Sequence, residues 1–236
     1  GGARGRGRGR AGRAAGGGEG GGARAAVYCA GERCAERDDR AAGSETPPAV
    51  LFRYAPDRRG EHPREHLAPF SGILQADAYA GFGKLYESAR KPGAITEAAC
   101  WAHARRKFFV LADIASKVRN KKPIVVSPLA LQGVKKIDAI FEKERAINGH
   151  SPEQRLTFRQ EHIVSLVEDL EAWMRVERAK LSRHAEVAKA MDYMLKRWTA
   201  FTRFLDDGRI CLSNNAAERG LRGIAMTESF CTSFVS

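Results

Sequence analysis

Two acidic residues stand where the sequence could support metal chemistry. Asp77 ends the apolar stretch Gly72–Asp77, which is predicted to be a strand, and a segment with helical spacing follows it. In α/β sheets, ligand-binding groups gather at the carboxyl ends of strands. Glu218 follows three candidate helix caps at residues 213–215. Carboxylates on different elements are the hard oxygen ligands that Mg²⁺ uses in phosphoryl transfer, so this pair is the first candidate site.

Each acid also has a purely structural interpretation. Asp77 could cap the helix that follows it, because Asp is a favoured N-cap residue. Asn215 and Glu218 have the spacing of a capping box, and Glu218 with Arg222 has the i, i+4 spacing of a helical ion pair. Local sequence alone leaves both interpretations open. Cys100 and His103 have the spacing of half a zinc site, but no second matching pair completes it.

The composition points to a polyanionic partner. Of 236 residues, 40 are Lys or Arg and 28 are Asp or Glu, which gives a net charge of +12. Residues 1–24 hold six arginines, one glutamate and 12 of the 24 glycines, so +7 remains on the rest of the chain. A segment with so little to bury is predicted to be disordered. Apolar runs are far too short to cross a membrane, and the N-terminus has no apolar signal region.

The elements that must position these residues begin near residue 46. β-forming residues predict strands over 49–54, 72–77 and 95–101. Helical spacing predicts helices over 62–70, 78–90 and 103–112. This alternation of strands and helices is typical of the α/β class.

The middle of the chain is predicted to be entirely helical. Ser151, with Pro152 after it and Gln154 at the third position, has the signature of a helix start. Two apolar seams repeat at spacings of 3 and 4 and predict an antiparallel helical hairpin; they are formed by Ile163, Val167, Leu170 and Met174, and by Val187, Met191, Met194, Trp198, Phe201 and Leu205. The turn at 206–208 ends the second seam.

Four stretches together resemble one family. They are PDRRGEH at 56–62, GILQADAYAGF at 72–82, EAACWAHARRKFF at 97–109, and the long run at 192–223 that contains LSNNAAERGLRG. These runs, in this order, resemble the insertion sequence 66 family of transposases, mobile-element enzymes of the Asp-Asp-Glu superfamily. The resemblance covers about residues 46–225.

The resemblance implies an incomplete ribonuclease H-like core interrupted by an all-α helical insertion. Asp77 matches the second acid of the family's triad and Glu218 the glutamate, so both are expected to bind Mg²⁺, two ions of which serve DNA cleavage and strand transfer in the superfamily. His103, Arg105, Arg106 and Lys107 are expected to contact DNA phosphates, or else form a solvated helix face. Arg219 and Arg222 are likewise candidate DNA contacts.

The chain departs from the family pattern at its N-terminus. The family's first catalytic Asp lies on an earlier strand, whereas no Asp precedes Asp38 here, and Asp38 and Asp39 lie at the wrong place. The Gly/Arg/Ala-rich segment there is either a decayed, out-of-frame stretch or an Arg/Gly-rich nucleic-acid-binding arm; it has no aromatic residue, which favours decay. A transposase fragment that is truncated and inactive alone is therefore expected.

The expected organisation has five parts: a disordered tail at 1–45, the first part of the core at 46–122, the helical insertion at 123–205, the last core helix with its glutamate at 206–225, and a divergent tail at 226–236. The partners implied are DNA at the element ends and target, with a homo-oligomer left open and no membrane. The location implied is the bacterial cytoplasm, at the nucleoid when DNA is bound. The alternative is a noncatalytic, basic nucleic-acid-binding protein, which would shift DNA without cutting it.

Overall fold

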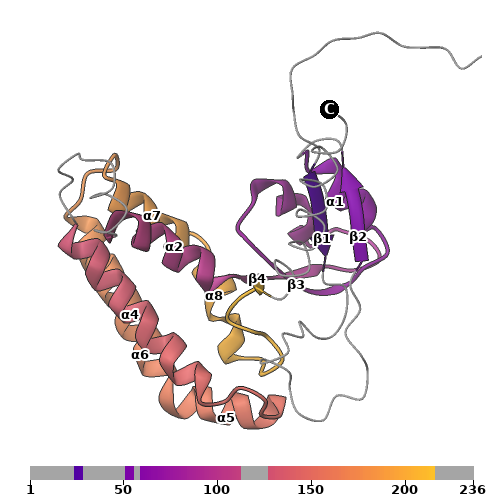
Figure 1. Ribbon diagram of the computed structural model, residues 1–236. Coiled ribbons are helices and arrows are strands. Elements are labelled where there is room, and N and C mark those ends of the chain that lie inside the picture. Colours follow the sequence, from indigo (N-terminus) through magenta and orange to yellow (C-terminus); the bar gives the residue numbers. More distant parts are fainter. Residues whose placement is uncertain (1–23, 29–50, 56–58, 113–126, 216–236) are drawn as a thin grey trace, which may run out of the picture.

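The computed structural model describes residues 24–28, 51–55, 59–112 and 127–215. Its strands form two small sheets (Figure 1). β1 (Arg24–Tyr28) pairs antiparallel with β2 (Leu51–Ala55), and β3 (Gly72–Ala76) pairs in parallel with β4 (Ile95–Ala99). The described chain is thus a mixed α/β structure in which helices predominate.

Strand β1 lies inside the range predicted to be disordered. The sequence predicts that order begins near residue 46, whereas Arg24–Tyr28 pairs residue by residue with Leu51–Ala55. The segment RAAVY lacks the glycines that dominate the residues before it and ends in two β-forming residues, Val27 and Tyr28. The structure thus has a strand at Arg24–Tyr28 within the range 1–45 that was expected to be a disordered tail, and the rest of that range lies outside the described residues.

A small apolar cluster fixes the parallel pair. Short helices α1 (Glu61–His66) and η1 (Ala80–Tyr86) cover it, and the buried residues are Leu67, Leu74, Leu85 and Ile95. The Arg90 guanidinium donates to the carbonyl oxygens of Phe70 (2.7 Å) and Gly93 (2.8 Å), and so joins the two loops that lead into β3 and β4. The helix predicted over 78–90 is a 3₁₀ segment over 80–86 only.

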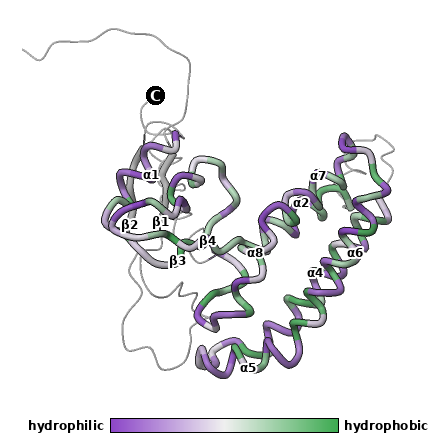
Figure 2. Tube along the Cα trace, turned by 180° about the vertical axis from the view of Figure 1, so that it is seen from behind, coloured by the Kyte–Doolittle hydropathy of each residue, from purple (hydrophilic) through white to green (hydrophobic). Residues whose placement is uncertain are grey.

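The remaining elements form a helical body. They are α2 (Trp101–Ala112), α4 (Pro128–Arg145), α5 (Pro152–His162), α6 (Val164–Ala179), α7 (Glu186–Leu195), α8 (Trp198–Thr202) and η2 (Arg203–Leu205). The long helices α4 and α6 run side by side in Figure 1, with α2 and α7 packed together at one end. Apolar positions recur along them in Figure 2, as expected of helices that bury one face. Although α2 belongs to the predicted core at 46–122, it packs on α4 and α7 of the predicted insertion.

Side-chain caps define where two of these helices begin. Ser151 accepts from the Gln154 N–H at 3.3 Å, and the Gln154 side chain accepts from the Ser151 N–H at 3.0 Å. This is the capping box that the sequence predicts. Ser127 caps α4 in the same position, before Pro128.

The two predicted seams are buried, but the second is not one helix. All four residues of the first seam are buried, and so are all but Trp198 of the second. α6 and α7 pack together, as the hairpin prediction requires. The second seam is divided between two helices: α7 ends at Leu195, and Arg197 takes a non-helical conformation (φ −127°) before α8 begins. Arg197 forms an ion pair with Glu97 of β4, which directs the chain toward the sheet.

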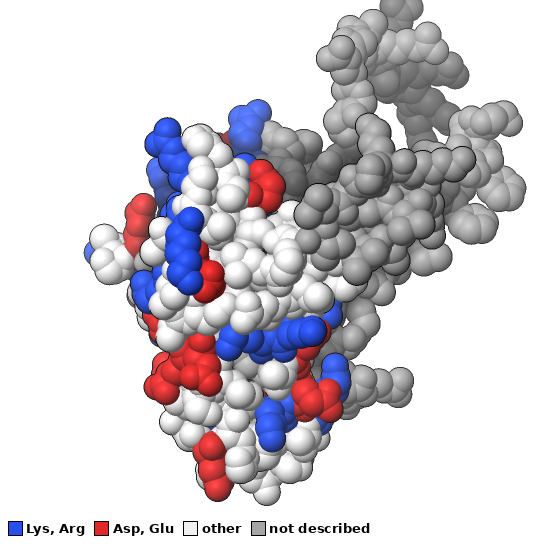
Figure 3. Space-filling view, turned by 90° about the vertical axis from the view of Figure 1, so that its left-hand side faces the viewer, with Lys and Arg blue, Asp and Glu red and all other residues white. Residues whose placement is uncertain are grey.

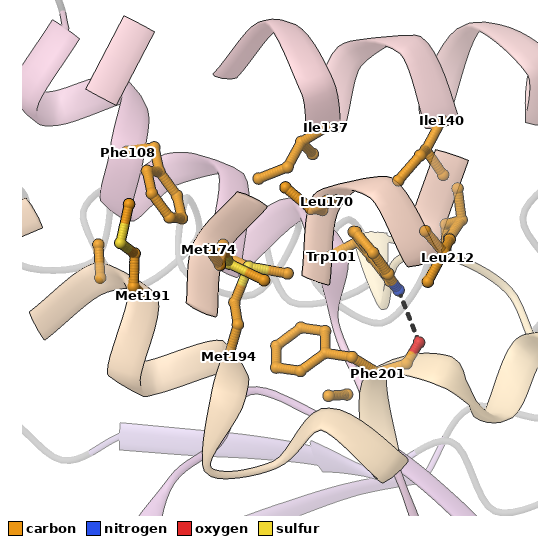
Figure 4. Close-up of a cluster of buried hydrophobic side chains, with 14 of the residues drawn as sticks. Trp101, Phe108, Ile137, Ile140, Leu170, Met174, Met191, Met194, Phe201 and Leu212 are labelled. Carbon is orange, nitrogen blue, oxygen red and sulfur yellow. Dashed lines mark hydrogen bonds between the residues drawn. The ribbon is translucent and has the colours of Figure 1, made fainter. Parts of the chain in front are cut away.

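Trp101 lies at the centre of the main core (Figure 4). Its ring is fully buried, packs edge-on against Phe201 and Phe204, and donates from Nε1 to the Phe201 carbonyl at 2.9 Å. A buried Trp needs a partner for its N–H, and here α8 supplies it. The predicted strand over 95–101 therefore ends at Ala99, because Trp101 opens α2 instead.

A buried ion cluster joins α4 and α5 to the chain that returns toward the sheet. Glu144 accepts hydrogen bonds from Arg155 (3.0 Å) and from the fully buried Arg159. Arg159 also donates to the carbonyl oxygens of Phe204 and Ile210, each at 2.9 Å. Because every one of these contacts is deep in the interior, the cluster fixes the path of residues 204–210.

Candidate active site

Asp77 lies directly after β3, at the carboxyl end of the parallel pair. The Cys100 N–H donates to the Ala76 carbonyl at 3.3 Å, and the Trp101 N–H donates to the Leu212 carbonyl at 2.8 Å. The Gln75 side-chain amide also donates to the Cys211 carbonyl. The chain segment that leads toward Glu218 therefore passes the same edge of the sheet as Asp77.

The loop after Asp77 is held by the helical body. The Ala78 N–H donates to the Tyr193 hydroxyl of α7 at 3.2 Å, and the Lys107 ammonium of α2 lies 4.3 Å from the centre of the Tyr193 ring. The Tyr79 N–H donates back to the Asp77 carbonyl at 2.6 Å. Asp77 is thus flanked by contacts that reach both α2 and α7.

A pocket of about 570 Å³ opens beside Asp77, between α2 and α7. Its charged and polar lining comes from both helices and from the loop after β3: Asp77, Tyr79, His103, Arg106, Lys107, Glu186, Lys189 and Tyr193. Val110, Leu111 and Ala190 add apolar surface. Cations therefore outnumber carboxylates in this pocket, which suits an anionic ligand.

Two half-buried tyrosines near Asp77 keep their protons. Burial raises the pKa of the Tyr193 hydroxyl, and the charge of Asp77 raises it further. Burial likewise raises the pKa of Tyr86, and the charge of Glu97 adds to the rise. Deprotonating either hydroxyl would place a new negative charge near a carboxylate, so both are neutral near pH 7.

The structure brings together only part of the predicted site. Asp77, His103, Arg106 and Lys107 all line the pocket. Arg105 does not: it points to α4 and forms a bidentate ion pair with Asp138 (2.5 and 3.0 Å). Residues 103, 106, 107 and 110 have the spacing of one helix face, which separates them from Arg105. Glu218, Arg219 and Arg222 lie outside the described residues, so the pairing of Asp77 with Glu218 stays a prediction.

Sequence reasoning missed the contribution of α7. Glu186, Lys189 and Tyr193 line the pocket, and their spacings of 3 and 4 place them on one face of that helix. The same spacing that reveals the buried seam could have revealed this polar face. What the spacing cannot tell is that the face meets α2 and the loop after Asp77.

Some oxygen atoms at this edge lack a donor. Within the described residues, the buried side-chain oxygens of Gln75 and Asn214 have no hydrogen-bond partner. Amide oxygens, like carboxylates, are ligands that hard cations accept in proteins. Among the same residues, no three His, Cys, Asp or Glu side chains gather into a metal-binding group. Cys100 is buried and not in a disulfide.

Comparison with known proteins identifies the family. The sequence profile of the transposase IS66 family matches residues 30–236 of this chain. The chain belongs to the IS66 family of transposases. The match extends beyond the resemblance over 46–225 and includes residues 226–236, which the sequence analysis treated as divergent.

Curated relatives of this IS66 chain occur in Sinorhizobium fredii. The uncharacterized protein y4hP is 53% identical over 193 residues, which is 80% of this chain and 35% of y4hP. The uncharacterized proteins y4qI and y4jD are 36% and 32% identical and are covered to 34% and 36% of their own length. The chain thus spans roughly a third of the curated relatives it matches. No solved structure matches it.

Proposed function

We propose that this chain supplies part of the catalytic site with which an IS66 transposase cleaves and transfers DNA strands. The observation that carries the proposal is the position of Asp77 at the carboxyl end of a parallel strand pair, beside a cation-lined pocket, in a chain of this family. The parallel pair is compatible with the edge of a ribonuclease H-like core. The segment from Ile210 to Leu212, at the same edge, leads within a few residues to Glu218.

Asp77 and Glu218 would hold Mg²⁺ in this site, and the bound ions would activate the attacking oxygen and stabilise the leaving oxygen. Arg106 and Lys107 would hold the phosphates of the strand near Asp77. Tyr193, through the Ala78 N–H, would keep the loop after Asp77 in place. A homo-oligomer that brings two element ends together is part of the same proposal.

We expect no strand transfer by this chain on its own. The triad needs a third carboxylate on an earlier strand, and no Asp precedes Asp38. Two carboxylates hold two cations less firmly against their mutual repulsion than three do.

The test uses the relative y4hP with residues of this chain grafted in place of its matching segment. Nicking of a plasmid carrying the element ends is measured with Mg²⁺ or Mn²⁺. Nicking by the graft, its loss in Asp77→Asn and in Glu218→Gln, and its retention in Asp138→Asn would support the proposal. Asp138 is the matched control, because it is a carboxylate paired with Arg105 outside the pocket.

Two results would contradict the proposal. Nicking that persists in Asp77→Asn would remove Asp77 from the reaction. A graft that shifts DNA in a gel without cutting it would favour the noncatalytic nucleic-acid-binding protein.

A further inference from the structure

We propose that the pocket between α2 and α7 binds one unpaired nucleotide of a DNA strand. The pocket's size is the first reason. Its volume of about 570 Å³ is in the range of small-ligand sites, which is enough for a nucleotide and far too small for a duplex. The inference rests on the proposed function only in taking DNA as the substrate.

The second reason is the chemistry of the lining. Arg106 and Lys107 of α2 and Lys189 of α7 supply cations for a phosphate. Lys189 is exposed and forms an ion pair at 2.6 Å with the exposed Glu186, and a phosphate can displace such a pair. His103 also lines the pocket, and the two carboxylates in the lining are those of Asp77 and Glu186.

The third reason is that aromatic and apolar groups alternate with these cations. Tyr79 and Tyr193 line the pocket, and Val110, a pocket residue on α2, is 58% exposed. In a duplex the bases are stacked and present only their edges in the grooves, so their faces cannot stack on a protein side chain. A basic groove with aromatic side chains is therefore the signature of a site for unpaired bases.

The conformation of Tyr79 shows how this surface is built. Its ring lies against the backbone of Gly81, where a Cβ atom would come within 2.2 Å of the ring, and it packs edge-on against Phe82 at 5.4 Å. Tyr79 can hold this position in the pocket only because residue 81 is glycine. The ring is half-exposed, so a base can reach it.

The test compares two DNA probes, a fluorescein-labelled dT12 strand and a blunt duplex of 20 base pairs, by anisotropy with the full chain in EDTA. EDTA makes the binding measurement independent of metal and of cleavage. Lys189→Ala should weaken dT12 binding about threefold or more and lower the log–log salt slope by about 0.7, the value for one phosphate contact on a single strand. The duplex affinity should change less than twofold.

Lys180→Ala is the matched control. Lys180 is also an exposed lysine paired with a glutamate three residues before it (Glu177, 2.8 Å), but it lies outside the pocket. Its removal should leave both affinities equal to those of the parent chain. Tyr79→Leu should weaken dT12 binding about tenfold, because base stacking on an aromatic ring is lost. Circular dichroism checks that each variant folds.

Equal losses for strand and duplex would overturn the inference in favour of a backbone track. Unchanged dT12 affinity in Lys189→Ala and Tyr79→Leu would overturn it outright. Both results are independent of the nicking test: the pocket can bind dT12 in a chain that never cuts, and Asp77 can serve cutting without this pocket.

Discussion

The helical body and the pocket beside Asp77 both contain charged side chains, but in opposite settings. In the body, Glu144, Arg155 and Arg159 are buried, and they form hydrogen bonds with one another, with backbone carbonyls and with the Cys211 sulfur. In the pocket, Arg106 and Lys189 are exposed, and Lys189 forms an exposed ion pair with Glu186. Figure 3 shows the charges interspersed over one face of the molecule rather than gathered by sign. The charges of the two regions therefore differ in accessibility: those of the cluster are enclosed by the protein, whereas the cations around the pocket are open to a ligand.

The largest effect is expected from breaking the buried cluster. Arg159→Leu removes the donor to three backbone carbonyls and leaves Glu144 with a single arginine. Removing one partner of a buried ion pair costs about 3–5 kcal/mol of the free energy of unfolding. Urea denaturation at pH 7 measures this loss.

Arg175→Leu is the control for Arg159→Leu, because it breaks an ion pair on the surface. Arg175 pairs with Glu171 at 2.6 Å on an exposed helix face, where ion pairs contribute about 0–1 kcal/mol. Similar losses for the two variants would mean that the cluster does not hold the interior together.

A somewhat smaller loss is expected at Gly208. A Cβ atom there would lie 1.8 Å from the Pro152 carbonyl oxygen, and both groups are backbone, so neither can swing away. Gly208→Ala should therefore cost about 1–3 kcal/mol, as overpacking does. Gly83→Ala is the control, since nothing lies within 4 Å of its added methyl group. Equal urea midpoints for Gly208→Ala and the parent chain would show that Gly208 is not closely packed against the start of α5.

In the pocket region, a glycine substitution should change binding rather than stability. Gly81→Ala displaces the Tyr79 ring, a side chain that can rotate into solvent. We expect the free energy of unfolding to change by less than about 1 kcal/mol. The dT12 affinity should fall as it does in Tyr79→Leu. A large stability loss with unchanged dT12 affinity would make this loop structural, like the body.

The smallest effect concerns the ion pair between α6 and α7. The hydrogen bond from Arg178 lowers the pKa of Asp192, so the pair stabilises the fold above the ordinary aspartate pKa of about 3.9. This contribution is lost as the pH falls through the lower pKa of the folded state. Between pH 5 and pH 2, Asp192→Asn should therefore lose less stability than the parent chain in parallel urea titrations. Identical pH profiles would show that the pair contributes nothing.

Local patterns predicted the helical body better than the sheets. The capping box at Ser151 and both apolar seams depend on residues a few positions apart, and the structure contains them. The break at Arg197 escaped prediction because the ion-pair partner of Arg197 is Glu97, 100 positions away, and such a contact leaves no local signal in the sequence. Strand β1 escaped for the same reason, since its partner is β2.

The candidate site was predictable in part. Asp77 could be predicted as a site residue because it ends a predicted strand. The family resemblance predicted that the basic residues after β4 contact DNA. The sequence could not separate Arg105 from its neighbours, because Asp138 lies on another helix. Lys189 and Tyr193 belong to a pocket assembled from three segments that are far apart in the chain, at 77–79, 103–111 and 186–193, and only the fold brings them together.

The hydrogen bond between the Trp101 N–H and the Leu212 carbonyl has a consequence for how this architecture varies. It brings two points 111 positions apart in the chain to within 2.8 Å, so everything between them is a closed excursion from the edge of the sheet. The entropy lost in closing such a loop grows only logarithmically with its length, about 0.6 kcal/mol for each doubling. Helices can therefore be added to or removed from the segment between Trp101 and Leu212 at little cost in loop-closure entropy, as long as the hydrogen bond between these two residues still forms.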